Sequence, residues 1–263
     1  MTATADLLGA IAAGARTAAA AREDVTPLDV LEAQIRRRPG GAAFHAALAS
    51  SPVPRVIAEC KRRSPSRGIL RAAYDPPAHA VAYARAGAAA ISVLTEPSFF
   101  DGAPEHLADV RAAVDVPLLR KDFIVTRYQV VESAVLGADA ILLIVGALDD
   151  EELPARLADA GGLGLAALVE AHDADELRRA MDAGARIIGV NSRNLRTLEV
   201  DPAVLERLAD AIPDHVVAVA ESGIQNAADL ARLGSLGYDA FLVGERLIAS
   251  PDPGAALAEL RRG

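Results

Sequence analysis

Short runs of apolar residues recur along this chain, and a segment with helical character follows each of them. The runs are VIAEC from 56, AAISVL from 89, VPLLR from 116, ADAILLIV from 138, GLAALVE from 164, RIIGVN from 186, VVAVAE from 216 and AFLVG from 240. They begin about 26 residues apart, a pattern that is typical of βα units. Their continuous apolar character predicts parallel strands buried on both faces.

Glycines punctuate the connections between these units. Gly87, Gly137, Gly184 and Gly237 each stand shortly before a predicted strand, where a left-handed glycine can end the preceding helix. Eight such units predict an α/β fold, a closed (β/α)8 TIM barrel. A doubly wound open sheet is the alternative, but that fold would carry a glycine-rich dinucleotide turn after the first strand. The turn is absent from this sequence.

Residues 1–50 precede the first strand and are predicted to form an N-terminal helical extension of two helices. We expect this extension to belong to a single domain that spans residues 1–263. Thr26 is predicted to cap the second helix, with Pro27 at its first position. The extension could plug the bottom of the barrel, or it could lie over the top and shape the site.

Composition excludes several classes of protein. A net charge of -9 argues against a general nucleic-acid binder, which needs clustered cations. The single cysteine, Cys60, excludes an internal disulfide and a cysteine-rich metal site. Its outward-facing strand position predicts a buried small hydrophobe instead of a nucleophile. The histidines lack the spacing of metal ligands, so no zinc or iron site is expected.

The apolar N-terminus does not read as a targeting segment. It lacks a basic region at its start, and Asp6 and Arg16 interrupt it, which argues against a signal peptide. The sequence contains no stretch that approaches a transmembrane span. We therefore expect a cytoplasmic protein with no membrane partner.

The first predicted strand ends in charged residues. Side chains alternate between the faces of a strand, so Ile57, Glu59 and Lys61 share one face. A carboxylate and an ammonium on a largely apolar strand are costly to bury unless they are paired or used. Barrel enzymes place their chemistry at such strand ends. Taken alone, the segment is equally consistent with a surface ion pair.

Charged or polar residues, together with a phenylalanine and two glycines, follow most of the other strands as well. They are Lys121, Asp122 and Phe123 after strand three, Glu170 after strand five, Asn191 and Arg193 after strand six, Glu221, Ser222 and Gly223 after strand seven, and Gly244 and Glu245 after strand eight. One such group is more often structural than catalytic, but their joint placement around one mouth predicts an active site. His172 follows Glu170 but is expected in the loop, outside the core set.

The loops after strands seven and eight suggest an anion site. Barrels commonly bind phosphate there with backbone N–H groups, and Gly223 and Gly244 would let an anion approach the main chain closely. The basic, hydroxyl-rich loop around Ser64 could contact the same ligand. The alternatives are glycines that merely permit tight turns and a solvated basic patch.

The motifs together resemble the indole-3-glycerol-phosphate synthase family. The matching segments are IAECKRRSPSRG (57–68), LTEPSFFDG (94–102), LLRKDFIV (118–125), GADAILLIV (137–145), LVEAHD (168–173), IGVNSRNL (188–195), VAESGI (219–224) and FLVG (241–244). The resemblance implies a cofactor-free lyase of tryptophan biosynthesis. It would close the ring of 1-(2-carboxyphenylamino)-1-deoxyribulose 5-phosphate with loss of CO2 and water. We expect a monomer whose partner is this phosphorylated small molecule.

The resemblance also implies roles for individual residues. Lys121 matches the general acid and Glu170 the other principal acid–base residue. Glu59 and Lys61 match a pair that holds the anthranilate portion and assists dehydration. The remaining assignments are Asn191 in the catalytic set, Ser64, Phe100, Phe123, Arg193, Glu221 and Ser222 as substrate-binding residues, and Ser222, Gly223, Gly244 and Glu245 as phosphate-binding residues.

Two departures from the family pattern and two rival functions stand beside this interpretation. Ala103 replaces a frequent serine, so a helix loses a hydroxyl cap, and Arg246 stands where a small residue is frequent. A phosphoribosylanthranilate isomerase would need a cysteine and an aspartate at strand ends, but Cys60 faces the wrong way. A catalytically silent, metabolite-binding barrel predicts broken acid–base positions, whereas Lys121 and Glu170 are present.

Overall fold

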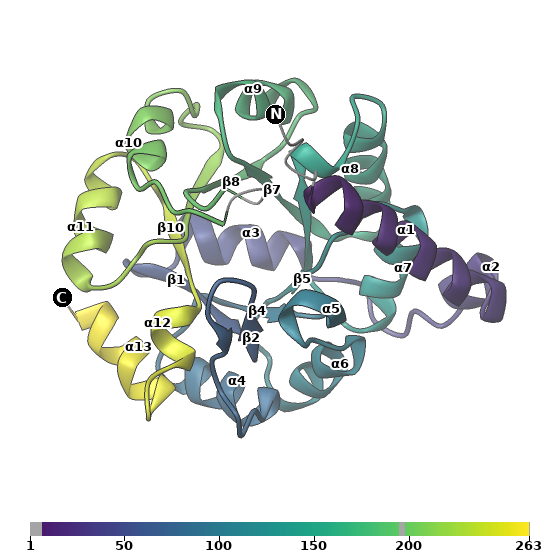
Figure 1. Cartoon of the computed structure of the whole chain (residues 1–263), viewed down its shortest axis with the longest axis horizontal. Coiled ribbons are helices and arrows are strands. Elements are labelled where there is room, and N and C mark those ends of the chain that lie inside the picture. Colours follow the sequence, from purple (N-terminus) through teal and green to yellow (C-terminus); the bar gives the residue numbers. More distant parts are fainter. Residues whose placement is uncertain (1–6, 195–197, 263) are drawn as a thin grey trace, which may run out of the picture.

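The computed structural model describes residues 7–194 and 198–262 and contains a closed parallel barrel (Figure 1). Neighbouring strands follow the order β1-β10-β9-β8-β7-β6-β5-β4. Their bounds are Arg55–Cys60 (β1), Ala90–Leu94 (β4), Leu118–Lys121 (β5), Ala140–Ile144 (β6), Ala166–Ala171 (β7), Ile187–Asn191 (β8), Val217–Glu221 (β9) and Ala240–Val243 (β10). The predicted (β/α)8 barrel is confirmed, with each apolar run forming one strand.

Helices surround the barrel and cover the outward-facing strand residues (Figure 1). They are α4 (Pro76–Arg85), α6 (Pro104–Ala113), α7 (Arg127–Val135), α8 (Glu152–Leu163), α9 (Ala174–Asp182), α10 (Ala203–Ala209), α11 (Ala227–Ser235) and α13 (Pro253–Arg262). Short elements lie in the loops: the pair β2 (Arg63–Ser64) and β3 (Gly68–Ile69), α5 (Pro97–Phe100), the 3-10 turn η1 (Val145–Ala147) and α12 (Glu245–Ile248).

Local signals in the sequence explain several of these boundaries. The helix-ending glycines adopt positive φ as predicted, from 83° at Gly87 to 102° at Gly237. Ala103 is the N-cap of α6 and makes no side-chain cap, while Pro104 occupies the first helical position. Cys60 is fully buried among outward-facing residues, and burial raises the pKa of its thiol. An unreactive, core cysteine follows.

The N-terminal extension differs from the prediction in its helices. It forms α1 (Leu7–Val25), α2 (Leu28–Glu32) and α3 (Gly41–Ser50), three helices where two were expected. The predicted Thr26 cap is wrong, because the Thr26 N–H donates to the Arg22 carbonyl at 2.8 Å and so belongs to the end of α1. Helix α2 instead has Pro27 as its N-cap, without a side-chain hydrogen bond.

The extension occupies both ends of the barrel. Phe44 and Leu48 of α3 are fully buried in one cluster with inward-facing strand residues such as Ile57, so α3 plugs the bottom. A Cβ at Gly41 would lie 2.4 Å from the Ala166 nitrogen, so only glycine permits this approach. Helix α1 lies over the opposite end, where it contacts η1 and α7 and buries Leu8 (Figure 1). The extension therefore occupies both of the positions given as alternatives from the sequence, the bottom of the barrel with α3 and the top with α1.

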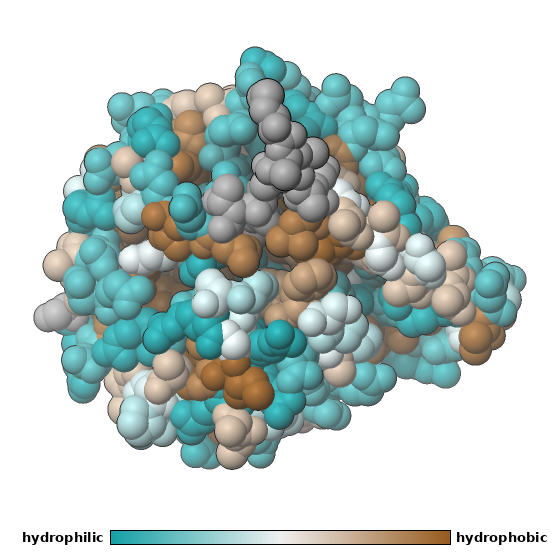
Figure 2. All heavy atoms as spheres, viewed as in Figure 1, coloured by the Kyte–Doolittle hydropathy of each residue, from teal (hydrophilic) through white to brown (hydrophobic). Residues whose placement is uncertain are grey.

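Hydropathy varies across the face that carries the carboxyl ends of the strands. In Figure 2 apolar residues gather near the middle of this face, while its rim is largely hydrophilic. None of the helices within residues 7–194 and 198–262 has the length and hydropathy needed to cross a bilayer.

Candidate active site

A cavity of about 280 Å³ opens at the carboxyl ends of the barrel strands. All but one of the residues predicted for the site line this cavity. The lining residues are Glu59, Lys61, Phe100, Lys121, Phe123, Glu170, Asn191, Arg193, Glu221, Ser222, Gly223, Gly244 and Glu245. Ser64, the exception, is buried in β2, and its hydroxyl has no partner among the described residues. The alternation of side chains along eight parallel strands therefore converges on one chemical centre.

Lys121 stands at the centre of the cavity between two carboxyl groups. Its Nζ lies 3.2 Å from Glu170 Oε2 and 3.4 Å from Glu221 Oε2. Burial alone would lower the pKa of the ammonium, but the surrounding carboxylates raise the pKa above its ordinary value. Lys121 is therefore cationic across the physiological range.

The pKa values of the two carboxyl groups beside Lys121 are shifted in opposite directions. Burial would raise the pKa of Glu170, but Lys121 and His172 together hold that pKa well below its usual range. For Glu221, burial outweighs Lys121 and the neighbouring Glu170 charge adds to it, so its pKa rises to about 8. One ionised and one protonated carboxyl thus share the lysine at neutral pH, an arrangement that places a base and an acid together.

His172 contributes to this difference, although the sequence analysis left it outside the core set. Its Nε2 lies 3.3 Å from Glu170 Oε1, and its Nδ1 lies 2.9 Å from Glu176 Oε2. Burial would lower the pKa of the imidazole, but the two carboxylates raise it to about 10. The sequence signal was its position two residues beyond Glu170, because strand β7 continues to Ala171 and keeps the pair together.

Glu59 and Lys61 form the predicted pair at the end of β1. Lys61 Nζ lies 2.5 Å from Glu59 Oε1, and Glu59 is 2% exposed. A Cβ at Gly244 would lie 2.2 Å from the same Glu59 oxygen. Glycine at this position therefore provides space for the carboxylate, in addition to any role in a tight turn.

Arg193 and Glu245 join three loops at the mouth. The Arg193 guanidinium donates to Ser66 Oγ at 3.2 Å and to Glu245 Oε1 at 3.3 Å. Asn191 Oδ1 accepts the Arg193 backbone N–H at 3.0 Å. Arg246 also lines the mouth, and its guanidinium lies 3.7 Å from a Glu259 carboxylate oxygen.

Phe100 and Phe123 supply an apolar side of the cavity. Phe100 lies on α5, whose N-terminus is capped by the Glu96 carboxylate, which accepts the N–H groups of residues 98–100. Phe123 is 7% exposed and packs with Leu142 and Ile144. Two aromatic rings and a short apolar strand surface can accommodate an aromatic ring of a ligand.

The loop after β9 has an unusual backbone. Ser222 adopts φ 66° and Gly223 adopts φ 75°, so two successive residues are left-handed. Such a conformation is costly for serine and typically occurs where a functional site requires it. It presents the main chain of residues 222 and 223 at the cavity wall.

Comparisons with known proteins agree on one family. The family model described as indole-3-glycerol phosphate synthase matches residues 8–260. Relatives with that name include one from Streptomyces griseus, 50% identical over 97% of this chain and 94% of its own. Another, from Mycolicibacterium smegmatis, is 48% identical over 98% of this chain and 94% of its own.

Similarity to solved structures supports the fold alone. Thiamine phosphate pyrophosphorylase from Pyrococcus furiosus aligns with a TM-score of 0.62 over 83% of this chain and 96% of its own, at 18% identity. An N-acetylmannosamine-6-phosphate 2-epimerase from Clostridium perfringens aligns with a TM-score of 0.60 over 77% of this chain and 90% of its own, at 14% identity.

Proposed function

This chain belongs to the indole-3-glycerol phosphate synthase family, and from that premise we propose how its cavity performs the reaction. The enzyme is a carboxy-lyase of tryptophan biosynthesis. Its substrate is 1-(2-carboxyphenylamino)-1-deoxyribulose 5-phosphate. A carbon of the anthranilate ring attacks the ketone, CO2 leaves, and loss of water completes the indole. The ammonium of Lys121 between two carboxyl groups is the observation that carries this proposal.

Lys121 donates the proton that the ketone oxygen needs during ring closure. Carbon–carbon bond formation places negative charge on this oxygen, and a buried ammonium both stabilises the charge and transfers the proton. The raised pKa of Lys121 keeps the ammonium charged, which supports its part in stabilising the developing negative charge. Departure of CO2 then restores the electrons of the aromatic ring without another acid.

Dehydration requires an acid at the departing hydroxyl and a base at the proton that is lost. Glu170 serves as the base, since its depressed pKa keeps it ionised. Glu59 and Lys61, paired at 2.5 Å on the opposite part of the wall, hold the anthranilate portion and assist the departure of water. Separate groups for the two proton transfers avoid the need for one residue to serve as acid and base in turn.

The remaining cavity residues bind and orient the substrate. Phe100 and Phe123 enclose the anthranilate ring, and Asn191, Arg193 and Glu221 contact its polar groups. The phosphate lies against backbone N–H groups of the two loops built from Ser222, Gly223, Gly244 and Glu245, with Ser64 nearby. The left-handed backbone at residues 222 and 223 supports this placement, because it exposes the main chain at the cavity wall.

The assembly and location of the enzyme complete the proposal. We propose that the whole chain acts as one unit and as a cytoplasmic monomer. All the residues assigned above come from one chain, and all of them except Ser64 line one cavity. A sedimentation profile at the mass of a single chain, 27.2 kDa, is the expected result, and a larger species would contradict the monomer.

The chain contains no tryptophan, and this makes a direct assay possible. Indole fluorescence should rise when purified protein is mixed with the carboxyphenylamino-deoxyribulose phosphate without added metal. A rise that depends on Lys121 supports the proposed acid, because Lys121→Met should abolish it. Absence of a rise in the wild-type protein, with substrate bound, would refute the proposed function.

A further inference from the structure

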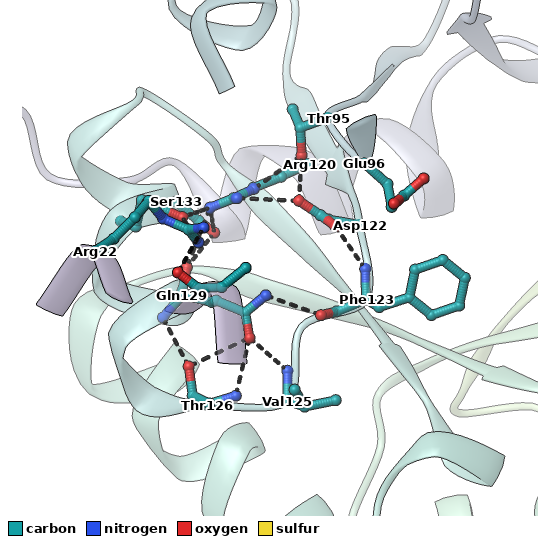
Figure 3. Close-up of polar contacts among 12 residues, drawn as sticks. Arg22, Thr95, Glu96, Arg120, Asp122, Phe123, Val125, Thr126, Gln129 and Ser133 are labelled. Atoms are coloured by element: carbon teal, nitrogen blue, oxygen red, sulfur yellow. Dashed lines mark hydrogen bonds and ion pairs between the residues drawn. The ribbon is translucent and has the colours of Figure 1, made fainter. Parts of the chain in front are cut away.

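Arg120 is a fully buried arginine outside the cavity, and the proposed mechanism does not use it. It directly precedes Lys121 on β5, so its side chain points outward, toward α7, while Lys121 points inward. Figure 3 shows its guanidinium among side chains of the β5–α7 segment. It donates to Thr95 Oγ1 at 3.1 Å, to Ser133 Oγ at 3.2 Å and to Asp122 Oδ2 at 3.0 Å.

Asp122 transmits the position of this guanidinium to the next residue of the chain. One carboxylate oxygen accepts from Arg120 and from the Thr95 hydroxyl, the latter at 2.6 Å. The other oxygen accepts the Phe123 backbone N–H at 2.8 Å. The Phe123 ring lines the cavity. The hydrogen bonds of Arg120 outside the barrel therefore connect, through Asp122, to a residue of the cavity wall.

The other side of the same residue is also held. Gln129 of α7 donates its amide to the Phe123 carbonyl at 2.9 Å, and its Oε1 accepts the Val125 N–H at 3.0 Å (Figure 3). Both main-chain groups of Phe123 are thus fixed by side chains. Arg120 also donates to the Gln129 backbone carbonyl at 3.4 Å. Arg120 therefore contacts both residues that hold the main chain of Phe123, Asp122 and Gln129.

The network reaches the N-terminal extension through Glu132. Arg120 Nη1 lies 2.8 Å from Glu132 Oε2, and Arg22 of α1 donates to both oxygens of Glu132 at 2.6 and 3.0 Å. Two arginines and two carboxylates form a chain without net charge from α1 to the cavity wall. Buried ion pairs add little net stability because their desolvation is costly, so geometric specificity is the better explanation for this one.

Thr95, which contacts both Arg120 and Asp122, also donates its backbone N–H to the Lys121 carbonyl at 3.2 Å. We propose that Arg120 is a positioning residue that fixes Lys121 and Phe123 for catalysis, and that α1 supports it through the contact between Arg22 and Glu132. This inference rests on the proposed function, because its effect is transmitted to the proposed acid and ring-binding wall. A positioning role predicts changes in both kinetic constants. A misplaced Lys121 lowers kcat, and a less rigid Phe123 wall raises KM. A purely structural role would lower the melting temperature and leave both constants unchanged.

The test compares three variants at a temperature where all are folded. Arg120→Lys retains a charge but lacks the planar fork that reaches several acceptors, and we expect kcat to fall by about tenfold or more, with a raised KM. Arg22→Met should give a smaller loss in the same direction. Arg127→Met is the matched control, because it removes a half-exposed arginine of α7 whose ion pairs, among the described residues, are with Asp159 and Glu32. It should leave both constants unchanged.

The outcomes separate this inference from the proposed function. Wild-type turnover with unchanged kcat and KM in Arg120→Lys and Arg22→Met would overturn the positioning role alone. Absence of turnover in the wild type would refute the proposed function itself. If Arg120→Lys does not fold, Arg22→Met decides, since its side chain is 37% exposed and its loss leaves Arg120 paired with Glu132. Wild-type constants in that variant would overturn the support by α1, and with it the proposal as stated.

Discussion

Gly189→Ala offers a sharp test of the site, because one methyl group would displace the Glu221 carboxyl beside Lys121. Gly189 lies within β8, and a Cβ there would stand 2.1 Å from Glu221 Oε1, where ordinary contacts begin at 3.4 Å. The carboxyl would therefore have to retreat by about 1.3 Å. Glu221 lies 3.4 Å from Lys121 Nζ, so this movement changes the pair that the proposed mechanism uses.

The magnitude follows from that displacement. A misplacement of about 1 Å can reduce turnover about 10²-fold, so we expect kcat of Gly189→Ala to fall by about two orders of magnitude. The fold should suffer less, because the nearest obstacle is the end of a side chain. Overpacking costs about 1–3 kcal/mol, which corresponds to a decrease of several degrees in melting temperature for a chain of this size.

The assay is indole fluorescence under saturating substrate, with a melting curve for each variant. Gly161→Ala is the matched control, because a Cβ at this position in α8 has no atom within 4 Å. It should leave kcat unchanged and stabilise the helix by up to about 1 kcal/mol. Wild-type kcat in folded Gly189→Ala would refute the argument that the position of Glu221 matters for catalysis.

Three further predictions concern the charged centre. Lys121→Met should lower kcat by at least about 10²-fold without loss of the circular dichroism of the fold; near-normal turnover would remove it from the mechanism. Glu170→Gln should lower kcat with little change in KM, whereas a change confined to KM would make it a binding residue only. His172→Gln should raise the pKa of Glu170 and move the acidic limb of the kcat profile to higher pH; an unmoved limb would contradict the contact.

The barrel and most of its site could be predicted from the sequence, because both depend on short-range periodicity. Apolar runs gave the strands, and residue parity placed Glu59 and Lys61 inward. Strand ends converge in any parallel barrel, so Lys121, Glu170 and Glu221 could be expected at one mouth. These conclusions depend on the order of the strands around the closed barrel, and they need no interatomic distances.

The rest depends on contacts between elements that local patterns do not encode. Arg120 precedes a lysine and an aspartate, and such a run usually indicates a solvated strand end, yet the side chain is fully buried. Its partners lie in the loops after β4 and β5 and on α7: Thr95, Asp122, Gln129, Glu132 and Ser133. The contact of His172 with Glu170 depends on the direction of the chain after β7, and the location of the N-terminal helices depends on which apolar faces the finished barrel leaves open.

The least predictable property is the distribution of protons between Glu170 and Glu221. Glu221 keeps its proton up to a pKa of about 8, while the unfolded chain loses it near the ordinary value, so ionisation of this group opposes folding as pH rises through that window. Glu170 has the opposite sign: its lowered pKa contributes stability above the ordinary value, and that stability is lost as pH falls below it. Because His172 contacts Glu170 on the side away from Lys121, the imidazolium favours ionisation of Glu170, and the shared proton therefore resides on Glu221.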